Sequence, residues 1–118
     1  MSITWARKTT TAGYAAAEHL FSHGCRHIAF VGGYADASAR EERASGVAEF
    51  LSDRGLTLDS EHSVVCEPAR PPAREAAMRL LTNDPTVDGI VCFSDVVAFG
   101  VLDAIADIGS QCGIWTSG

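Results

Sequence analysis

The chain has 118 residues, which suits one compact domain or one lobe of a larger domain. Hydrophobic residues make up 47% and charged residues 20%, as in ordinary globular proteins. The formal net charge of −6 argues against direct binding to nucleic acid, because a phosphate backbone attracts basic surfaces and repels acidic ones.

No apolar run is long enough to cross a bilayer, and the first ten residues, MSITWARKTT, lack the apolar core of a secretory signal. In an intact protein these features indicate the cytoplasm. None of the four cysteines lies in a C-x-x-C pair, so neither a zinc ribbon nor a thioredoxin-like site is indicated. Cys66 and Cys92 lie in apolar runs, where we expect reduced, buried side chains; a redox pair is the alternative.

The first predicted element is an alanine-rich helix over residues 11–23, with Thr11 as its N-cap and Gly24 as its left-handed stop. Its apolar stripe consists of Tyr14, Ala17, Leu20 and Phe21. Residues 27–31 (HIAFV) follow as an apolar run that ends at a glycine pair, 32–33. Because this run does not alternate with polar residues, it predicts a strand that is buried on both faces.

Ser38 and Glu41 fit a capping box, which predicts a helix that begins at Ser38 and stops at Gly55. Residues 63–66 (SVVC) predict a second short strand. The proline pair at 71–72 suits the first turn of the next helix, because that turn needs no amide donors.

Residues 89–93 (GIVCF) predict a third buried strand, after which Ser94 caps a helix that ends at Gly109. The segment 110–118 either adds a fourth strand at 114–117 or is a disordered or non-native end. Helices that alternate with short apolar strands imply a parallel sheet covered on both faces. We therefore expect an α/β fold with three layers, αβα, around a parallel sheet of three or four strands.

Several candidate sites are disfavoured by missing parts. The glycine pair at 32–33 lies where a phosphate cradle would, but G-x-G-x-x-G and G-x-x-x-x-G-K-[ST] are absent, so a tight turn is favoured over nucleotide binding. No nucleophile–base–acid set or G-x-S-x-G elbow is present, so we expect neither an enzyme nor a cofactor. A possible zinc cluster lacks the usual ligand spacing, and we expect no metal. Its members are His19, His23, Cys25 and His27.

Ligands of open parallel sheets bind beyond the carboxyl ends of the strands. The loop 32–38, the loop 67–71 and the pair 94–95 each follow a predicted strand, so they should converge on one edge. An arginine at such an edge offers a rigid fork for hydroxyls or carboxylates, and a solvated surface arginine is the alternative. The arginines at these positions are Arg40, Arg43 and Arg70.

Three stretches resemble motifs of the lac-repressor/galactose-repressor (LacI/GalR) family of regulators. Residues 12–33 (AGYAAAEHLFSHGCRHIAFVGG) resemble its A-x-x-H-L-x-x-x-G-H-R-x-I-A-x-x-G-G stretch. Residues 43–46 (RASG) are similar to its R-x-x-G-[aromatic] helix, and residues 88–102 (DGIVCFSDVVAFGVL) to D-A-I-x-x-x-N-D-x-x-A-x-G-x-L. The three occur in order and at the right spacing, and the resemblance covers roughly residues 10–109.

The resemblance implies the C-terminal lobe of a two-lobed effector domain like a type I periplasmic sugar-binding protein. Residues 1–9 would be an N-terminal extension, 10–109 the lobe, and 110–118 a truncated or altered tail. The family's helix-turn-helix, hinge and first lobe would lie outside this chain, and DNA would be bound only through that helix-turn-helix. Closure of an inter-lobe cleft on a small-molecule effector would shift dimer geometry and DNA affinity.

The expected function is therefore effector sensing in a cytoplasmic, homodimeric transcription regulator, with a sugar or related metabolite as effector. The alternative is a lobe of a periplasmic sugar-binding protein of an ABC transporter. A third class, a small Rossmann-like enzyme, has no motif in its support.

Five residues are implied as ligand-binding by the resemblance. Arg43 matches the arginine that contacts effector hydroxyls or carboxylate, and Ala39 stands at the start of the same helix. Ser94 replaces the usual asparagine with a shorter side chain that carries a single hydroxyl, which alters affinity or specificity. Asp95 matches a neighbouring aspartate of structural role. Pro68 lies near the position of an aromatic that stacks on the sugar, so that platform is missing.

Overall fold

The computed structural model describes residues 12–116. Within this range one parallel sheet has the strand order β2-β1-β3-β4. The elements in chain order are α2 (Ala12–Ser22), β1 (Ile28–Val31), α3 (Ser38–Asp53), the 3₁₀ turn η2 (Ser60–His62), β2 (Ser63–Val64), α4 (Arg70–Asn83), β3 (Gly89–Cys92), α5 (Asp95–Ile108) and β4 (Gly113–Thr116). The predicted α/β fold with a parallel sheet is confirmed. Of the two alternatives for residues 110–118, the fourth strand is the one observed.

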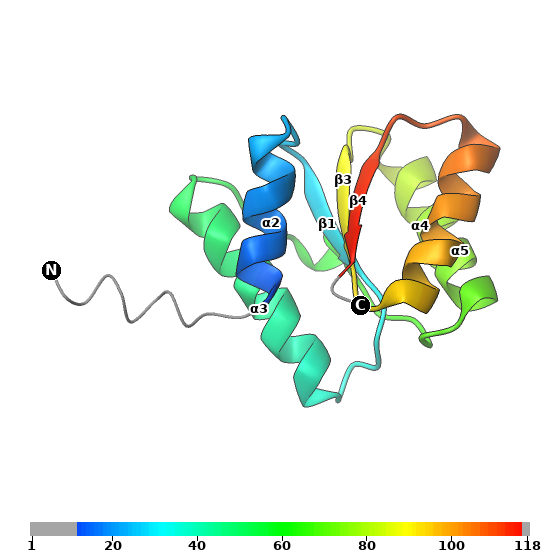
Figure 1. Ribbon diagram of the computed structural model, residues 1–118, viewed down its shortest axis with the longest axis horizontal. Helices are drawn as coiled ribbons and strands as arrows, with labels where there is room; N and C mark the ends of the chain where they lie inside the picture. Colours follow the sequence, from blue (N-terminus) through cyan, green and yellow to red (C-terminus); the bar gives the residue numbers. More distant parts are fainter. Residues whose placement is uncertain (1–11, 117–118) are drawn as a thin grey trace, which may run out of the picture.

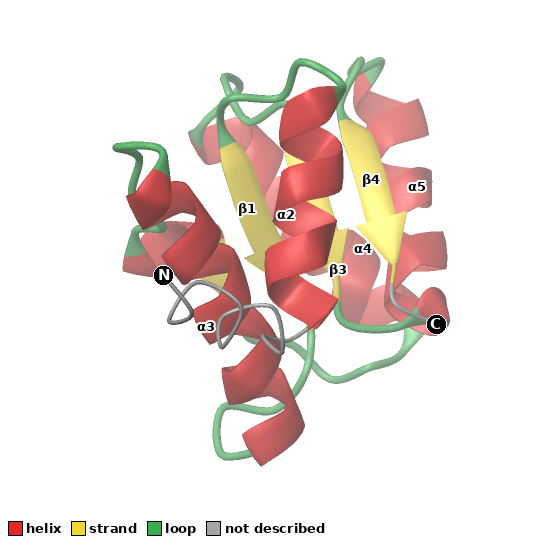
Figure 2. Cartoon of the chain, turned by 60° about the vertical axis from the view of Figure 1, so that its left-hand side comes forward, coloured by secondary structure: helices red, strands yellow, loops and turns green. Residues whose placement is uncertain are grey.

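The sheet lies between two pairs of helices. Helices α2 and α3 cover one face, and α4 and α5 cover the other (Figures 1 and 2). All four residues of β1 are buried because its side chains alternate between two cores. Ile28 and Phe30 pack with the α2–α3 core, and Ala29 and Val31 pack with the α4–α5 core. An apolar run without alternation is thus the pattern that this central strand requires.

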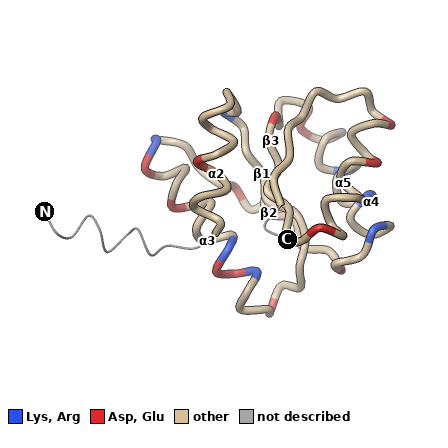
Figure 3. The backbone as a smooth tube through the Cα atoms, viewed as in Figure 1, with Lys and Arg blue, Asp and Glu red and all other residues tan. Residues whose placement is uncertain are grey.

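The strands run in the same direction, so their ends define two opposite edges of the sheet. In register, Ile28 pairs with Gly89 and Val31 with Cys92. We call the edge after Val31, Val64, Cys92 and Thr116 the carboxyl edge, and the opposite one the amino edge. Charged residues lie on the helices and loops, while β1 and β3 carry none (Figure 3).

The predicted helix ends are largely confirmed. Gly24 has φ +102° and Gly109 has φ +77°, the left-handed conformation that ends a helix and that glycine adopts without strain. The proline pair 71–72 occupies the first turn of α4. The predicted N-cap Thr11 lies outside the described residues.

Two local predictions are wrong. Ser38 does not cap α3, because Ala37 takes the extended N-cap conformation and Ser38 is already helical; no side-chain cap forms. The second strand is also shorter than residues 63–66. It ends at Val64, and Cys66 instead forms an isolated antiparallel bridge with Gly33.

Both helix pairs contain a close backbone approach at a glycine. A Cβ at Gly13 on α2 would lie 1.9 Å from the carbonyl oxygen of Arg43 on α3. A Cβ at Gly100 on α5 would lie 2.4 Å from the carbonyl oxygen of Arg70 on α4. Neither position accepts a side chain unless the helices separate. In the part of the chain that is described, no helix is long and apolar enough to cross a membrane.

Candidate functional site

The side chain of Arg43 reaches across the carboxyl edge from α3. Its Nη1 donates a 2.6 Å hydrogen bond to the carbonyl oxygen of Phe93, and its Cζ lies 4.9 Å from the centroid of the Phe93 ring. Arg43 is half-buried, and Nη1 is its one nitrogen that makes a side-chain hydrogen bond within residues 12–116. The guanidinium is thus held in place by a single carbonyl and retains N–H groups that a ligand can use.

Ser94 follows Phe93 directly and occupies the N-cap position of α5. Its backbone is extended, as at an N-cap, but its hydroxyl makes no capping bond. The Oγ atom is buried and has no hydrogen-bond partner within the described residues. A buried hydroxyl without a partner costs about 1–3 kcal/mol, so a polar ligand atom that reached it would recover that free energy.

Asp95 is the exposed first residue of α5, where the helix dipole favours a negative charge. Its Oδ1 accepts a 3.0 Å hydrogen bond from the hydroxyl of Thr116 at the end of β4. The contact joins the start of α5 to the edge strand. Asp95 therefore makes a structural contact, and its place in a ligand site stays a prediction.

Arg40 and Arg70 have partners within the protein. Arg40 is 7% exposed, and its guanidinium donates to the carbonyl oxygen of Gly32 and to the hydroxyl of Ser63, at 2.9 and 3.1 Å. Burial is the main reason that the pKa of Arg40 is lowered from its usual value. Arg70 pairs with both carboxylate oxygens of Asp103 on α5, at 2.7 and 3.0 Å. Both guanidinium groups are therefore engaged within the protein, the buried one of Arg40 more firmly than the exposed one of Arg70, and Arg43 is the one of the three that remains suited to a ligand.

Ala39 is exposed near the start of α3 and borders an open hollow. That hollow is lined by Ser38, Ala39, Glu41 and Glu42. Pro68 is half-buried in the loop between β2 and α4. The structure therefore places Arg43 against Phe93, the residue before Ser94, and the ligand-binding roles of Ala39 and Pro68 stay predictions.

Three residues at this edge were not singled out from the sequence. Phe93 holds Arg43 with both its carbonyl and its ring, and Thr116 holds Asp95. Tyr34, in the loop after β1, is 51% exposed. The sequence could have pointed to Phe93, because it is the last apolar residue before Ser94. Its contact with Arg43 could not be predicted, because that contact depends on the packing of α3 against the sheet.

The cysteines are free thiols: Cys25 and Cys92 are buried, Cys66 and Cys112 partly so. Burial raises the pKa of Cys92 to about 12, which keeps it protonated and unreactive at neutral pH. Across residues 12–116, no group of three or more His, Cys, Asp or Glu side chains is placed to hold a metal ion.

Comparison with known proteins places these features in context. The family described as "Periplasmic binding proteins and sugar binding domain of LacI family" matches residues 3–114. The maltose regulon regulatory protein MalI of Escherichia coli is 32% identical over 96 residues, which are 81% of this chain and 28% of MalI. The transcriptional repressor PurR of Glaesserella parasuis is 29% identical over 97 residues, 82% of this chain and 28% of PurR.

Solved structures of transcription regulators share this fold. A regulator described as of the LacI family, from Sanguibacter keddieii, has a TM-score of 0.78 and 28% identity, and the match covers 91% of this chain and 41% of that one. A complex of the transcriptional regulator CelR with cellobiose has a TM-score of 0.80 and 25% identity, covering 88% and 32%. The chain thus spans under a third of MalI and PurR, and these relatives are regulators rather than enzymes.

Proposed function

This chain belongs to the family of periplasmic binding proteins and LacI-type sugar-binding domains, and we propose on that basis that its carboxyl edge is one wall of an effector site. The effector would lie in a cleft between this lobe, the C-terminal one, and a second lobe. The observation that carries the proposal is that two groups able to bind a ligand are connected through Phe93 at this edge. Arg43 has N–H groups that make no other side-chain hydrogen bond within the described residues, and it is bonded to the carbonyl of Phe93. Ser94, the next residue after Phe93, has a hydroxyl without a partner in that range.

The chemistry of this edge favours a polyhydroxylated ligand. The guanidinium of Arg43 can donate two parallel hydrogen bonds to neighbouring hydroxyls or to a carboxylate. Ser94 can donate or accept one further bond once edge side chains move aside to expose its covered oxygen. A sugar or a related metabolite fits these donors, and CelR, one of the structural neighbours, is seen with cellobiose.

We further propose that the whole protein is a cytoplasmic transcription regulator that binds operator DNA through a separate helix-turn-helix domain. The formal net charge of this chain, −6, agrees with a sensing role and with DNA contacts made by another part of the protein. The named relatives MalI and PurR are regulators, which favours this assignment over a lobe of a transport protein.

A homodimer is the proposed assembly, and α5 offers a surface for it. Val96, Phe99 and Leu102 are 38%, 52% and 45% exposed and recur every three residues, so they share one face of the helix. Large apolar side chains that share an exposed face are typical of an interface.

The effector site is tested by Arg43→Ala in the whole protein, with isothermal titration against a panel of mono- and disaccharides. We expect a loss of affinity of about 10- to 100-fold, because a hydrogen bond to a charged group contributes about 1.5–3 kcal/mol. The melting temperature should stay within a few degrees of the unsubstituted protein, since the single hydrogen bond from Arg43 lies at the sheet edge.

The matched control is Arg79→Ala, which removes an exposed arginine of α4. It should leave affinity unchanged. Equal affinity in the Arg43→Ala protein and the control would remove Arg43 from the site.

The 118-residue chain alone should bind sugars weakly or not at all, because one wall of the cleft is missing. Micromolar binding of a sugar to this chain would contradict the two-lobed site.

A further inference from the structure

The amino edge of the sheet holds a cavity that the proposed effector site does not use. Its volume is about 120 Å³, far below the roughly 300–1,000 Å³ of drug-sized pockets. Residues that precede β1, β2 and β3 form its rim, together with the end of α3. Its lining consists of Arg26, His27, Ile28, Leu51, Leu56, Thr57, Asp59, His62, Asp84 and Val87.

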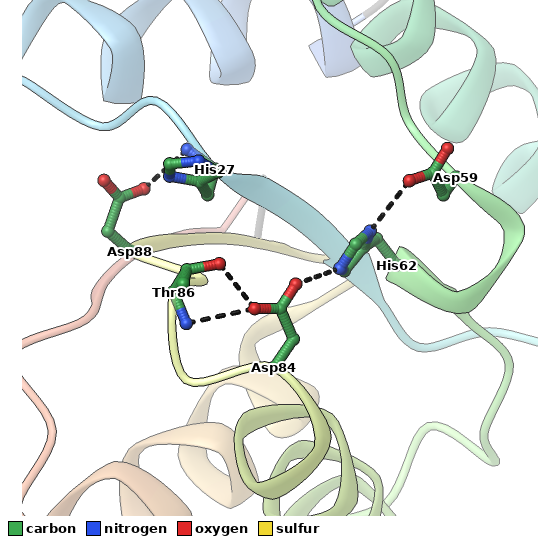
Figure 4. Close-up of polar contacts among 6 residues, drawn as sticks. All are labelled: His27, Asp59, His62, Asp84, Thr86 and Asp88. Atoms are coloured by element: carbon green, nitrogen blue, oxygen red, sulfur yellow. Dashed lines mark hydrogen bonds and ion pairs between the residues drawn. The ribbon is translucent and has the colours of Figure 1, made fainter.

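The polar side of the rim is built around His62 (Figure 4). Its Nε2 lies 2.7 Å from Asp84 Oδ2, and its Nδ1 lies 3.7 Å from Asp59 Oδ2. The other oxygen of Asp84 accepts hydrogen bonds from the hydroxyl and the amide of Thr86. These Thr86 bonds, followed by the one from His62, lower the pKa of Asp84 to about 2, so it is a carboxylate at every physiological pH.

Asp59 is the carboxylate of the rim that is open to a ligand. Its side chain is 58% exposed, against 32% for Asp84, and its contact with His62 is longer than a hydrogen bond. A cation that approaches the cavity mouth can therefore contact Asp59 without displacing His62 from Asp84.

Arg26, the arginine of the lining, hydrogen-bonds to backbone carbonyls and forms no ion pair with these acids within the described residues. The Arg26 guanidinium donates from Nη1 to the carbonyl oxygens of Phe21 and Cys25, and its Cζ stacks 3.8 Å from the Phe21 ring centroid. The amides of Arg26 and His27 are capped by Asp88, which adds a third carboxylate to this edge (Figure 4). The three carboxylates of Asp59, Asp84 and Asp88 outnumber the one guanidinium of Arg26 at this edge, so a cation is favoured over an anion.

The remaining walls are apolar. Ile28, Leu51 and Val87 are buried core residues that reach the cavity, and half-buried Leu56 lies beside them. An apolar recess beneath a carboxylate rim matches a ligand with a hydrocarbon part and a positively charged group. The hydrocarbon part contacts apolar side chains, and the charged group contacts a carboxylate.

We propose that this amino-edge cavity is a second small-molecule site, and that it takes small aliphatic ammonium ions. The alkyl part contacts Leu51, Leu56 and Val87, and the ammonium group pairs with Asp59. The site lies at the opposite end of the strands from Arg43 and Ser94, so it does not depend on the effector proposal.

The test is an NMR titration of the ¹⁵N-labelled 118-residue chain with n-butylammonium chloride, at constant ionic strength and pH. For so small a ligand we expect a saturable dissociation constant on the order of 1–10 mM. The shifts should concentrate on the amides of Leu56, His62 and Val87. n-Butanol, which has the same alkyl chain without the charge, and sodium butyrate, which has the opposite charge, should bind at least about threefold more weakly.

Asp59→Asn removes the open carboxylate with almost no change in size and should weaken butylammonium binding about three- to fivefold. The matched control is Asp36→Asn, which makes the same change in charge in an exposed loop at the other edge and should bind as the unsubstituted chain does. Equal effects of the two substitutions, equal binding of butanol, or shifts spread over the whole surface would each overturn the proposal.

Discussion

Asp84 shows how single residues stabilise this fold from the surface. It ends α4 at the C-cap position, and its carboxylate joins Thr86 in the following loop to His62, the last residue of η2, directly before β2. One side chain thus ties the edge strand to the segment that enters the central strand β3. Because these partners favour the charged form, they also make the link sensitive to acid.

Asp84→Asn should therefore lower the melting temperature at pH 7 and have little effect below about pH 2. The pKa of Asp84 is lowered from 3.8 to about 2 on folding, so its stabilising effect is complete above pH 3.8 and is lost as the pH falls through about 2. Thermal unfolding of both proteins followed by circular dichroism between pH 7 and pH 2 measures the difference. A difference that stays constant over this range would show that the charge of Asp84 is not what stabilises the link.

At the residue level the sequence could predict which side chains reach the carboxyl edge, but not their partners. The rule that parallel strands end at one edge brought Arg43 and Ser94 into the same candidate site. It could not show that Arg40, three residues earlier, turns inward to Gly32 and Ser63. That difference arises from the position of α3 over the sheet, which depends on contacts between residues far apart in the chain.

At the level of elements, the contact between α4 and α5 depends on one glycine. The backbone of Gly100 lies against Arg70 and Ala73, and two ion pairs, Arg70–Asp103 and Arg74–Asp107, connect the helices beside it. The ion pairs are exposed and contribute little, so close packing is the main source of stability here.

Gly100→Ala should destabilise the protein by about 1–3 kcal/mol, even though alanine is the better helix former. The added methyl would lie 2.4 Å from the Arg70 carbonyl oxygen and 2.7 Å from Ala73 Cβ, so the helices must separate. Urea unfolding measures the change. Ala106→Ser, at an exposed position of the same helix, should leave stability within about 0.5 kcal/mol; a Gly100→Ala protein as stable as this control would contradict the close approach.

Element types and most ends were predictable because they rest on local chemistry, such as the left-handed glycine after α5 and the prolines of α4. Predictions failed where two local signals compete. Ser38 and Glu41 have the spacing of a capping box, yet Ala37 takes the extended N-cap conformation and Ser38 is already the first residue of α3. The second strand ends early because Cys66 turns to pair with Gly33.

For the whole molecule, the apolar face of α5 predicts self-association. Sedimentation velocity of the 118-residue chain should show a weight-average mass that rises with concentration, because Val96, Phe99 and Leu102 are exposed together. Phe99→Glu should weaken the association at least about tenfold, since a charge in a desolvated interface costs well over 1.4 kcal/mol.

Glu18→Gln changes an exposed charge on α2, on the opposite face of the sheet, and provides the control. It should associate as the unsubstituted chain does. A chain that stays monomeric at all concentrations, or a Phe99→Glu variant that associates normally, would exclude this face of α5 as the contact.

The close approach at Gly13 has a mechanical consequence. The carbonyl that occupies the space of a Cβ there belongs to Arg43 itself, so the backbone of the proposed effector arginine rests directly on the first turn of α2. With no side chain between them, the two backbones are in direct contact at this level, so a shift of one helix presses on the other. A displacement of the Arg43 backbone would therefore be passed directly to the first turn of α2.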